Sequence, residues 1–417
     1  MILFDRGSLG PSWQTESGRL SRERPPADDE SVLRLDCAWD PRVTLRPGAI
    51  NAHTHLYSGL ASLGMPAPAQ APTNFLEILQ RVWWRLDRAL DAASLRAAAR
   101  YAIADALTHG TTTLIDHHES PNFIEGSLDV LADCAQELGI RLATGYGATD
   151  RNGGKEEGHR GLAECERFLR TNQRSFVRGL VALHASFTVS DETIRAAGEL
   201  ARKTAAPVHV HVAEDSADLF DAQKRGYEGP RERLMTLGAL PEHSLIAHGV
   251  HLTPVQVQRT KVAGLWLVQN PRSNEGNRVG YPVALKASPH VALGTDGWSS
   301  DMDAEAAALR RLGTAYGDPD EVMEARIHAG HALASELFGE KLGELREYGA
   351  ADVVVGIPGE LPRHVVVGGR RVVVGGRLVT GDLDEIRARA REAAPELWRR
   401  MQAISLSPTR GEGRGEG

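Results

Sequence analysis

The stretch Arg46-Pro47-Gly48-Ala49-Ile50-Asn51-Ala52-His53-Thr54-His55 joins a short apolar strand to two histidines at its end. Side chains two residues apart on a strand leave the same face, so His53 and His55 can reach one metal ion together. An isolated pair of this kind also fits a polar loop. Its interpretation therefore depends on the rest of the chain.

Three further segments place polar side chains where an apolar run ends. They are His211-Val212-Ala213-Glu214, Ala247-His248-Gly249 and Gly294-Thr295-Asp296-Gly297. Imidazoles with one carboxylate are the ligands of a catalytic zinc-type site that leaves a position for water. Asp296 alone could equally be a helix cap, but the joint occurrence of all the segments favours a metal site.

Strand and helix patterns alternate between residues 48 and 300. The first strand runs from Ile50 to the His53 motif, and seven more follow at 111–116, 141–146, 177–184, 207–212, 244–248, 265–269 and 291–294. Helical patterns at 127–138 and 191–204 separate some of them, whereas residues 272–289 leave little room for a full helix. Eight strands with helical crossovers predict an α/β fold, a parallel (β/α)₈ TIM-like barrel whose active site lies at the carboxyl ends of the strands.

The chain ends predict a second, smaller unit. Residues 1–49 are expected to be an irregular N-terminus plus part of a small β-sandwich, with a half-buried strand at 32–36. The barrel occupies residues 50–340. Short β-branched runs separated by glycine pairs in residues 341–383 supply the remaining sandwich strands. A helix at 384–406 and a disordered tail at 407–417 complete the chain.

Composition excludes several functional classes. The 417 residues carry a net charge of -7, which offers no basic surface for nucleic acid. No run is apolar enough to span a membrane, and the start lacks a signal-peptide core. The three cysteines have no CxxC spacing, so neither a disulfide framework nor a thiolate metal site is expected. A cytoplasmic enzyme with a small-molecule substrate is predicted.

The order of these motifs resembles the amidohydrolase superfamily. The chain follows its pattern of HxH, a strand-five histidine with HxxE, a strand-six histidine and a strand-eight aspartate. Asn270-Pro271-Arg272-Ser273-Asn274 resembles the NPxSN signature of the chlorohydrolase and aromatic deaminase branch. Within that branch the chain is most similar to the SsnA-type aminohydrolases, through Asn74-Phe75-Leu76-Glu77-Ile78-Leu79, Trp83-Trp84-Arg85-Leu86-Asp87, Asp116-His117-His118 and His184-Ala185-Ser186-Phe187-Thr188.

The resemblance implies a ligand set of His53, His55, His211 and Asp296 around one divalent ion, zinc first, with iron or manganese as alternatives. Two-metal relatives carry a carboxylated lysine at the end of the fourth strand. Here that strand ends at His184, and no lysine occurs between residues 156 and 202. A mononuclear site is therefore expected.

Catalytic roles follow from the same resemblance. Asp296 is expected to take a proton from water, His248 to orient that water, and Glu214 to protonate the substrate ring. The implied activity is a metal-dependent hydrolase that deaminates a purine-like or other nitrogen heterocycle. The alternatives are hydrolysis of a C–Cl, amide or carbamoyl bond, and a non-catalytic metal-binding relative.

Substrate contacts are expected from His184, Trp84, Arg151 and Ser300. For some of these residues a structural role is the alternative to a substrate contact. His184 fits a hydrogen-bonded strand-end histidine and Arg151 a solvated loop, and one tryptophan of the Trp83-Trp84 pair is expected in the core. His209 is interpreted as a core histidine with satisfied hydrogen bonds. By analogy with the family, a homodimer is expected.

Overall fold

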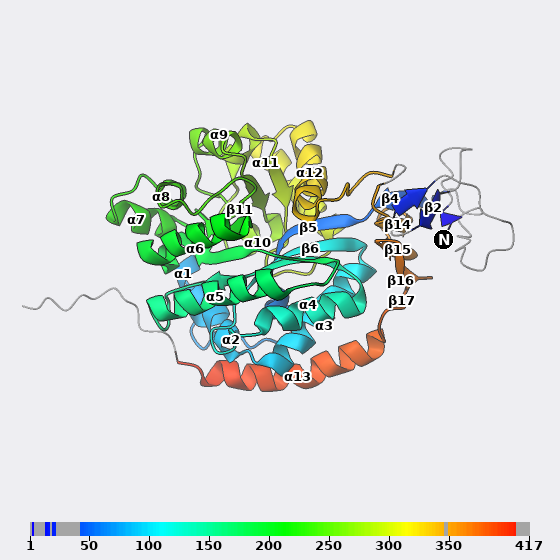
Figure 1. Cartoon of the computed structure of the whole chain (residues 1–417), viewed down its shortest axis with the longest axis horizontal. Coiled ribbons are helices and arrows are strands. Elements are labelled where there is room, and N and C mark those ends of the chain that lie inside the picture. Colours follow the sequence, from blue (N-terminus) through cyan, green and yellow to red (C-terminus); the bar gives the residue numbers. More distant parts are fainter. Residues whose placement is uncertain (1, 4–12, 17–18, 22–41, 346–348, 406–417) are drawn as a thin grey trace, which may run out of the picture.

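Eight parallel strands form a nearly closed barrel at the centre of the molecule (Figure 1). The computed structural model describes residues 2–3, 13–16, 19–21, 42–345 and 349–405. Around the barrel the strands follow the order of the chain, and β8 (Val177–Gly179) pairs with β7 outside this path. The barrel strands are β5 (Ala49–Thr54), β6 (Thr111–His118), β7 (Arg141–Ala148), β9 (Val181–Ala185), β10 (Val208–Val212), β11 (Leu245–His248), β12 (Trp266–Gln269) and β13 (Val291–Leu293).

Hydrogen bonds between the first barrel strand and the segment after the last strand help to close the barrel. The amides of Thr295 and Asp296 donate to the carbonyl of His53 at 2.8 and 2.9 Å. Asn51, buried on β5, donates from Nδ2 to Thr295 Oγ1 at 2.7 Å and accepts from the Thr295 amide at 3.1 Å. The asparagine therefore fixes the segment that carries Asp296 against the strand that carries His53 and His55.

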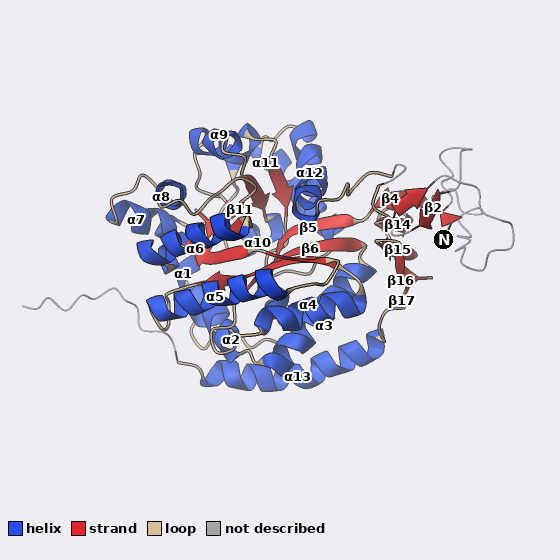
Figure 2. Ribbon diagram, viewed as in Figure 1, coloured by secondary structure: helices blue, strands red, loops and turns tan. Residues whose placement is uncertain are grey.

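Helices surround the barrel and cover its outer face (Figure 2). Two of them, α4 and α6, coincide with the predicted ranges, and the helices after β11 and β12 are short, as expected. The helices after β6 are α4 (Ser127–Leu138), α5 (Lys155–Thr171), α6 (Asp191–Thr204), α7 (Ser216–Lys224), α8 (Pro230–Thr236), α9 (Pro254–Val262), α10 (Pro271–Gly276), α11 (Met302–Tyr316) and α12 (Asp320–Phe338).

A helical segment follows β5 before the first long helix. It comprises the 3₁₀ turn η2 (Leu56–Ser58), α1 (Phe75–Ile78), the π-helical turn η3 (Leu79–Trp83) and α2 (Trp84–Ala89), and it leads to α3 (Ala92–Thr108). Asn74 caps α1 by accepting from the Glu77 amide. The Glu77 carboxylate accepts from the amide and hydroxyl of Thr73.

Strands from both chain ends form an antiparallel sheet beside the barrel. Its order is β17 (Arg377–Leu378), β16 (Arg370–Val374), β15 (His364–Val367), β14 (Val353–Gly356) and β4 (Thr44–Pro47). The predicted joining of N- and C-terminal strands is confirmed by the pairing of β4 with β14. The last helix, α13 (Leu383–Ala403), then returns along the barrel and packs on α2 and α3.

Two predictions about elements were wrong, and two others fall outside the described residues. The N-terminus is not wholly irregular, because β1 (Ile2–Leu3), β2 (Trp13–Glu16) and β3 (Arg19–Ser21) pair antiparallel. Backbone pairing needs no hydrophobic period, so these strands carry no periodic signal in the sequence. The predicted strand at 177–184 is divided at Leu180, whose amide turns to the Thr144 carbonyl. The predicted strand at 32–36 and tail at 407–417 lie outside the described residues.

Within the described part of the chain, no helix is both long enough and apolar enough to cross a membrane.

Candidate active site

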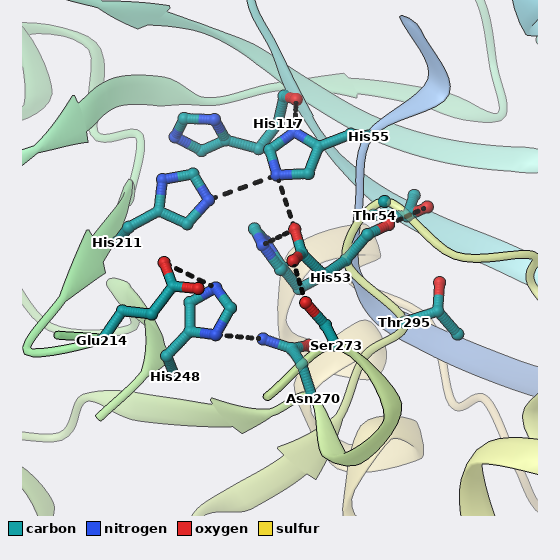
Figure 3. Close-up of polar contacts among 12 residues, drawn as sticks. His53, Thr54, His55, His117, His211, Glu214, His248, Asn270, Ser273 and Thr295 are labelled. Atoms are coloured by element: carbon teal, nitrogen blue, oxygen red, sulfur yellow. Dashed lines mark hydrogen bonds and ion pairs between the residues drawn. The ribbon is translucent and has the colours of Figure 1, made fainter. Parts of the chain in front are cut away.

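Four histidines and one aspartate meet at the carboxyl ends of the barrel strands (Figure 3). His53 and His55 come from β5, His211 from β10, His248 from β11, and Asp296 follows β13. The Nε2 of His55 lies 2.9 Å from Asp296 Oδ1 and 3.2 Å from His211 Nε2. The Nε2 of His53 lies 3.5 Å from the same Asp296 oxygen. The four residues predicted as ligands therefore face one small space.

Backbone carbonyls determine which ring nitrogen of two histidines carries hydrogen. The Nδ1 of His55 donates to the His117 carbonyl at 2.6 Å, and the Nδ1 of His211 donates to the His184 carbonyl at 2.5 Å. A carbonyl oxygen can only accept, so the single hydrogen that either ring carries when it is neutral lies on Nδ1, and its Nε2 is then free to bind a metal ion. The two Nε2 atoms lie 3.2 Å apart.

His53 and His248 are oriented by side chains instead. The Nδ1 of His53 lies 3.0 Å from His209 Nε2, and the Nδ1 of His248 donates to Asn274 Oδ1 at 2.9 Å. The Nε2 of both rings is buried without a hydrogen-bond partner among the described residues. The interpretation of His209 as a satisfied core histidine is wrong at one atom, because its Nδ1 is buried and unpartnered. Its Nε2 forms the 3.0 Å contact with the Nδ1 of His53.

This donor set fits a divalent metal ion. The ligand atoms of His53, His211, His248 and Asp296 lie within 4.8 Å of one another. Burial lowers the pKa of His53 to about 3 and the pKa of His211 well below its ordinary value. Burial acts in the same direction on His55, but the carboxylates of Glu119 and Asp296 raise the pKa of that ring well above its ordinary value. Imidazoles with one carboxylate suit zinc, iron and manganese alike. His248, which the family resemblance casts as a catalytic group, also lies close enough to join the ligands.

Asp296 is held by an unusual backbone conformation and by Ser273. Its φ is 54°, a left-handed value that is rare outside glycine, and Ala213 and His248 share that region at 53° and 71°. The Ser273 hydroxyl donates to Asp296 Oδ2, which leaves Oδ1 facing the histidines. Burial alone would raise the pKa of Asp296, but the imidazoles of His53 and His55 beside its carboxylate hold that pKa well below the ordinary range. The carboxylate is therefore ionised in the site.

Glu214 approaches the same space from the loop after β10. Its Oε2 lies 3.6 Å from His248 Nε2 (Figure 3). Burial, and then the charge of Asp296, raise the pKa of Glu214 well above its ordinary value. The loop is anchored by Asp218, which accepts from the amides of Ala213 at 2.8 Å and Phe187 at 3.1 Å. The site thus contains one ionised and one protonated carboxyl group, as acid–base catalysis requires.

Glu119 was missed by the sequence reasoning. It follows β6, is 1% exposed, and accepts from His117 Nδ1 at 2.6 Å. The Nε2 of His117 lies 3.0 Å from the Leu183 carbonyl and donates to it. The other Glu119 oxygen lies 3.4 Å from His55 Nδ1. An acid directly after His117-His118 at a strand end was the available signal.

A pocket of about 670 Å³, partly open to solvent, lies above this centre. Trp83 and Trp84 both line it, so the expectation that one of them is a core residue is wrong. The reason is the π turn η3, in which the Trp84 amide bonds the Leu79 carbonyl and one additional residue enters the turn. The aromatic and apolar lining consists of Tyr57, Phe75, Leu79, Trp83, Trp84, Ala185 and Phe187.

The predicted substrate contacts divide into two groups. His184 and Trp84 line the pocket, with their rings 6.2 Å apart. Arg151 is not among the lining residues, because its Nη2 pairs with Asp87 Oδ2 at 2.6 Å behind the Trp84 ring. Ser300 lies outside as well, since its hydroxyl accepts from Asn51 at 3.0 Å. Ser300 lines a neighbouring cavity instead.

Comparison with known proteins gives consistent results. The model of the amidohydrolase family matches residues 44–372. The chain is 30% identical to the 8-oxoguanine deaminase of Pseudomonas aeruginosa, over 85% of this chain and 88% of that protein. It is 29% identical to the 5′-deoxyadenosine deaminase of Methanopyrus kandleri, over 92% and 94%.

Solved structures show the same fold. An adenosine deaminase from Xanthomonas campestris with bound zinc has a TM-score of 0.74 and 24% identity, with 87% of each chain covered. The atrazine chlorohydrolase TrzN from Arthrobacter aurescens TC1, complexed with zinc, has a TM-score of 0.71 and 20% identity, with 92% of this chain and 95% of that chain covered. The predicted barrel architecture is confirmed.

Proposed function

The chain belongs to the amidohydrolase family, and we propose that it is a metal-dependent aminohydrolase that deaminates a purine-like nitrogen heterocycle. One observation carries the proposal. The carboxyl group of Glu214, whose pKa is raised by burial, lies 3.6 Å from His248 Nε2, beside the histidines that surround Asp296. The deaminase activities of the relatives named above agree with it.

We further propose that His53, His55, His211 and Asp296 hold a single divalent ion, zinc in the first instance. The zinc bound in two structurally similar proteins supports the identity of the ion. The end of β9 at Leu183-His184-Ala185, without a lysine, supports a count of one. When bound, such an ion lowers the pKa of a water molecule toward neutrality, and so supplies a nucleophile.

Asp296 is suited to receive the proton of the attacking water. Its Oδ2 is engaged by the Ser273 hydroxyl, so the position of the carboxylate is fixed before substrate arrives. His248 presents an unpartnered Nε2 to the same space, because Asn274 holds its other nitrogen. That nitrogen can accept a hydrogen bond from water and orient it toward the carbon under attack.

Glu214 is suited to the opposite task. Because burial raises the pKa of its carboxyl group well above the ordinary value, Glu214 can hold a proton and donate it to a ring nitrogen of the substrate. Protonation of the ring makes the adjacent carbon more electrophilic. After water has added to that carbon, the Glu214 carboxylate takes the proton of the added hydroxyl group, and the proton held by Asp296 passes to the amino group. The C–N bond then breaks, ammonia leaves, and the ring carbonyl forms.

The test is ammonia release from a panel of purines, pterins and aminotriazines by protein loaded with a defined metal. We expect release from at least one aminated ring, and its loss together with the bound metal in His211→Ala. A chloro-substituted triazine in the same panel tests the alternative: chloride release without ammonia from any amine would replace deamination by dechlorination. Metal content unchanged in His211→Ala would refute the ligand assignment. The homodimer and the cytoplasmic location remain predictions.

A further inference from the structure

Apart from the histidines and Tyr57, the ionisable side chains that line the pocket are carboxyl groups. Of the described residues that line it, none is lysine or arginine, and the acids are Glu119, Glu214, Asp215, Asp218 and Asp296. A phosphate or carboxylate that leaves water needs a cation or several N–H donors to replace its hydration. A metal ion bound at the histidine cluster would interact with the end of the substrate that reacts, not with a distant substituent. The remainder of the pocket offers an anionic substituent no charged partner.

Arg151 is the cationic residue that the sequence predicted as a substrate contact, but in the structure it is paired with Asp87. Its guanidinium and the Asp87 carboxylate form a pair at 2.6 Å, with side-chain exposures of 5% and 3%. The Trp84 ring lies 4.9 Å from the guanidinium carbon. A substrate anion would have to displace both the Asp87 charge and the Trp84 ring to reach Arg151.

The wall away from the histidines favours a flat ring. Phe75, Leu79 and Trp83 are spaced four residues apart along α1 and η3, so they lie on one face of that segment, and all line the pocket. Phe187 reaches the pocket from the segment after β9. Aromatic faces of this kind bind the planes of heterocycles by stacking, without preference for a particular ring.

We infer that the pocket selects a planar aromatic heterocycle whose substituents are uncharged or cationic, and rejects the same ring when it bears a phosphate or carboxylate. This inference rests on the proposed function, since it concerns the same site. It identifies the class of accepted compounds as free bases and unphosphorylated nucleosides. Compounds that carry an anionic group distant from the reacting carbon are excluded.

Binding of matched pairs tests the inference independently of turnover. The probes are adenosine with adenosine 5′-monophosphate, and pterin with pterin-6-carboxylate, titrated calorimetrically against the metal-loaded full chain. We expect the uncharged member of at least one pair to bind, and its anionic partner to bind about a hundredfold or more weakly, as an unpaired charge in an apolar site requires. Equal affinities within a pair, or no binding of either uncharged ring, would overturn the inference. Absence of ammonia release from rings that do bind would instead refute the proposed function alone.

A variant tests the contribution of the acidic wall. Asp215 caps α7 by accepting from the Ala217 amide at 2.9 Å, and asparagine caps helices equally well. Asp215→Asn removes one charge from the pocket while keeping the cap. We expect the affinity ratio of the monophosphate to adenosine to rise by roughly threefold to tenfold. The matched control is Asp382→Asn, the cap of α13 outside the pocket lining, which should leave that ratio unchanged. The same ratio in both variants would overturn the contribution of Asp215.

Discussion

The Nδ1 of His53 and the Nε2 of His209 lie 3.0 Å apart, in rings that are both fully buried. His209 is two residues before His211 on β10, so it shares the inward face of that strand and lies one layer deeper in the barrel. In the proposed metal site the His53 Nε2 is a ligand atom, so its Nδ1 would carry the hydrogen. His209 is placed to accept that hydrogen bond and so to set the tautomer of the proposed ligand.

Replacing His209 by leucine should weaken metal binding. The variant leaves the His53 Nδ1–H buried without an acceptor, and loss of such a partner lowers metal affinity by about 10- to 100-fold. Competition with a chromophoric chelator measures the change. His209→Gln is the matched control, because its amide oxygen supplies an acceptor, and it should retain more affinity than His209→Leu. Equal affinity in wild type and His209→Leu would show that the bond does not tune the ligand.

Replacing Glu214 by glutamine should abolish proton donation without loss of metal. Burial and the charge of Asp296 raise the pKa of Glu214, so the acid form predominates at neutral pH and activity falls as pH rises through that pKa. In Glu214→Gln we expect kcat to fall by about 10²- to 10⁴-fold, and the decline at high pH to disappear from the residual rate. Glu228→Gln, at an exposed pair with Arg259, serves as the control. A retained high-pH decline in Glu214→Gln would assign the acid to another residue.

Much of this site was accessible from the sequence because each strand end carries its own signal. A short apolar run followed by His53, His211, His248 or Asp296 is a local pattern, and barrel topology alone brings such ends together. The structure confirms that these residues meet. The period-two spacing of His209 and His211 was also visible, but only the position of His53 on another strand shows which hydrogen bond His209 makes.

Other features depend on packing that no local pattern reports. Glu119 gains its importance from His117 and His55, which contact it in the folded barrel. Trp83 and Trp84 both reach the pocket because they lie at a π turn. In an ordinary α-helix, two consecutive side chains would point in different directions. Arg151 was expected near substrate from its strand-end position, yet Asp87, distant in sequence, neutralises it. The positions and roles of such residues depend on contacts with residues that are distant in the sequence.

Arg272 is predicted to position the catalytic groups from a distance. Its backbone amide donates to Glu305 Oε1 at 2.9 Å, its Nε also bonds Glu305, and its Nη2 donates to the Ser299 carbonyl at 2.7 Å. The next two residues, Ser273 and Asn274, hold Asp296 and His248. Arg272 thus joins α10 to the segment after Asp296.

Arg272→Met keeps the length of the side chain and removes its bonds. We expect kcat to fall by up to about a hundredfold with a smaller change in KM, since small misplacements of catalytic groups act mainly on the chemical step. Metal content should remain that of the wild type. Arg272→Lys, which retains one donor for Glu305, should recover part of the rate. A change confined to KM would assign Arg272 to substrate binding instead.

The stability of the protein should depend on pH through Glu305. Burial raises the pKa of Glu305 to about 6, although the Arg272 guanidinium beside it acts in the opposite direction. The unfolded value is about 4.3. Below about pH 4 both states are protonated; as pH rises toward 6 the unfolded chain releases its proton first, so the folded state loses stability.

Relative to Glu305→Gln, the wild type should therefore lose about 2 kcal/mol of unfolding free energy between about pH 4 and pH 6.5. Urea denaturation of both proteins at several pH values measures this difference. Glutamine carries no charge at any pH, so the difference between the two proteins varies with pH only through Glu305, whose pKa already includes the effect of Arg272. A difference that stays constant with pH would show that Glu305 is ionised in both states throughout.

The barrel and the chain-end sheet are joined by a buried ion pair whose removal should be strongly destabilising. Arg141, at the start of β7, donates from Nε to Asp352 Oδ2 at 2.7 Å, and Asp352 also accepts from the Gly368 amide at 2.6 Å. Exposures of 1% and 4% leave little water to replace either partner. Asp352→Asn should lower the unfolding free energy by about 3–5 kcal/mol, because the Arg141 charge stays buried and keeps, among the described residues, Glu340 as its remaining acidic partner. Asp303→Asn removes an acid of the same type from an exposed pair with Arg46 at 3.2 Å, and should lower it by less than about 1 kcal/mol. Similar losses in the two variants, measured by urea denaturation, would mean that the sheet is held to the barrel by its apolar contacts rather than by this pair.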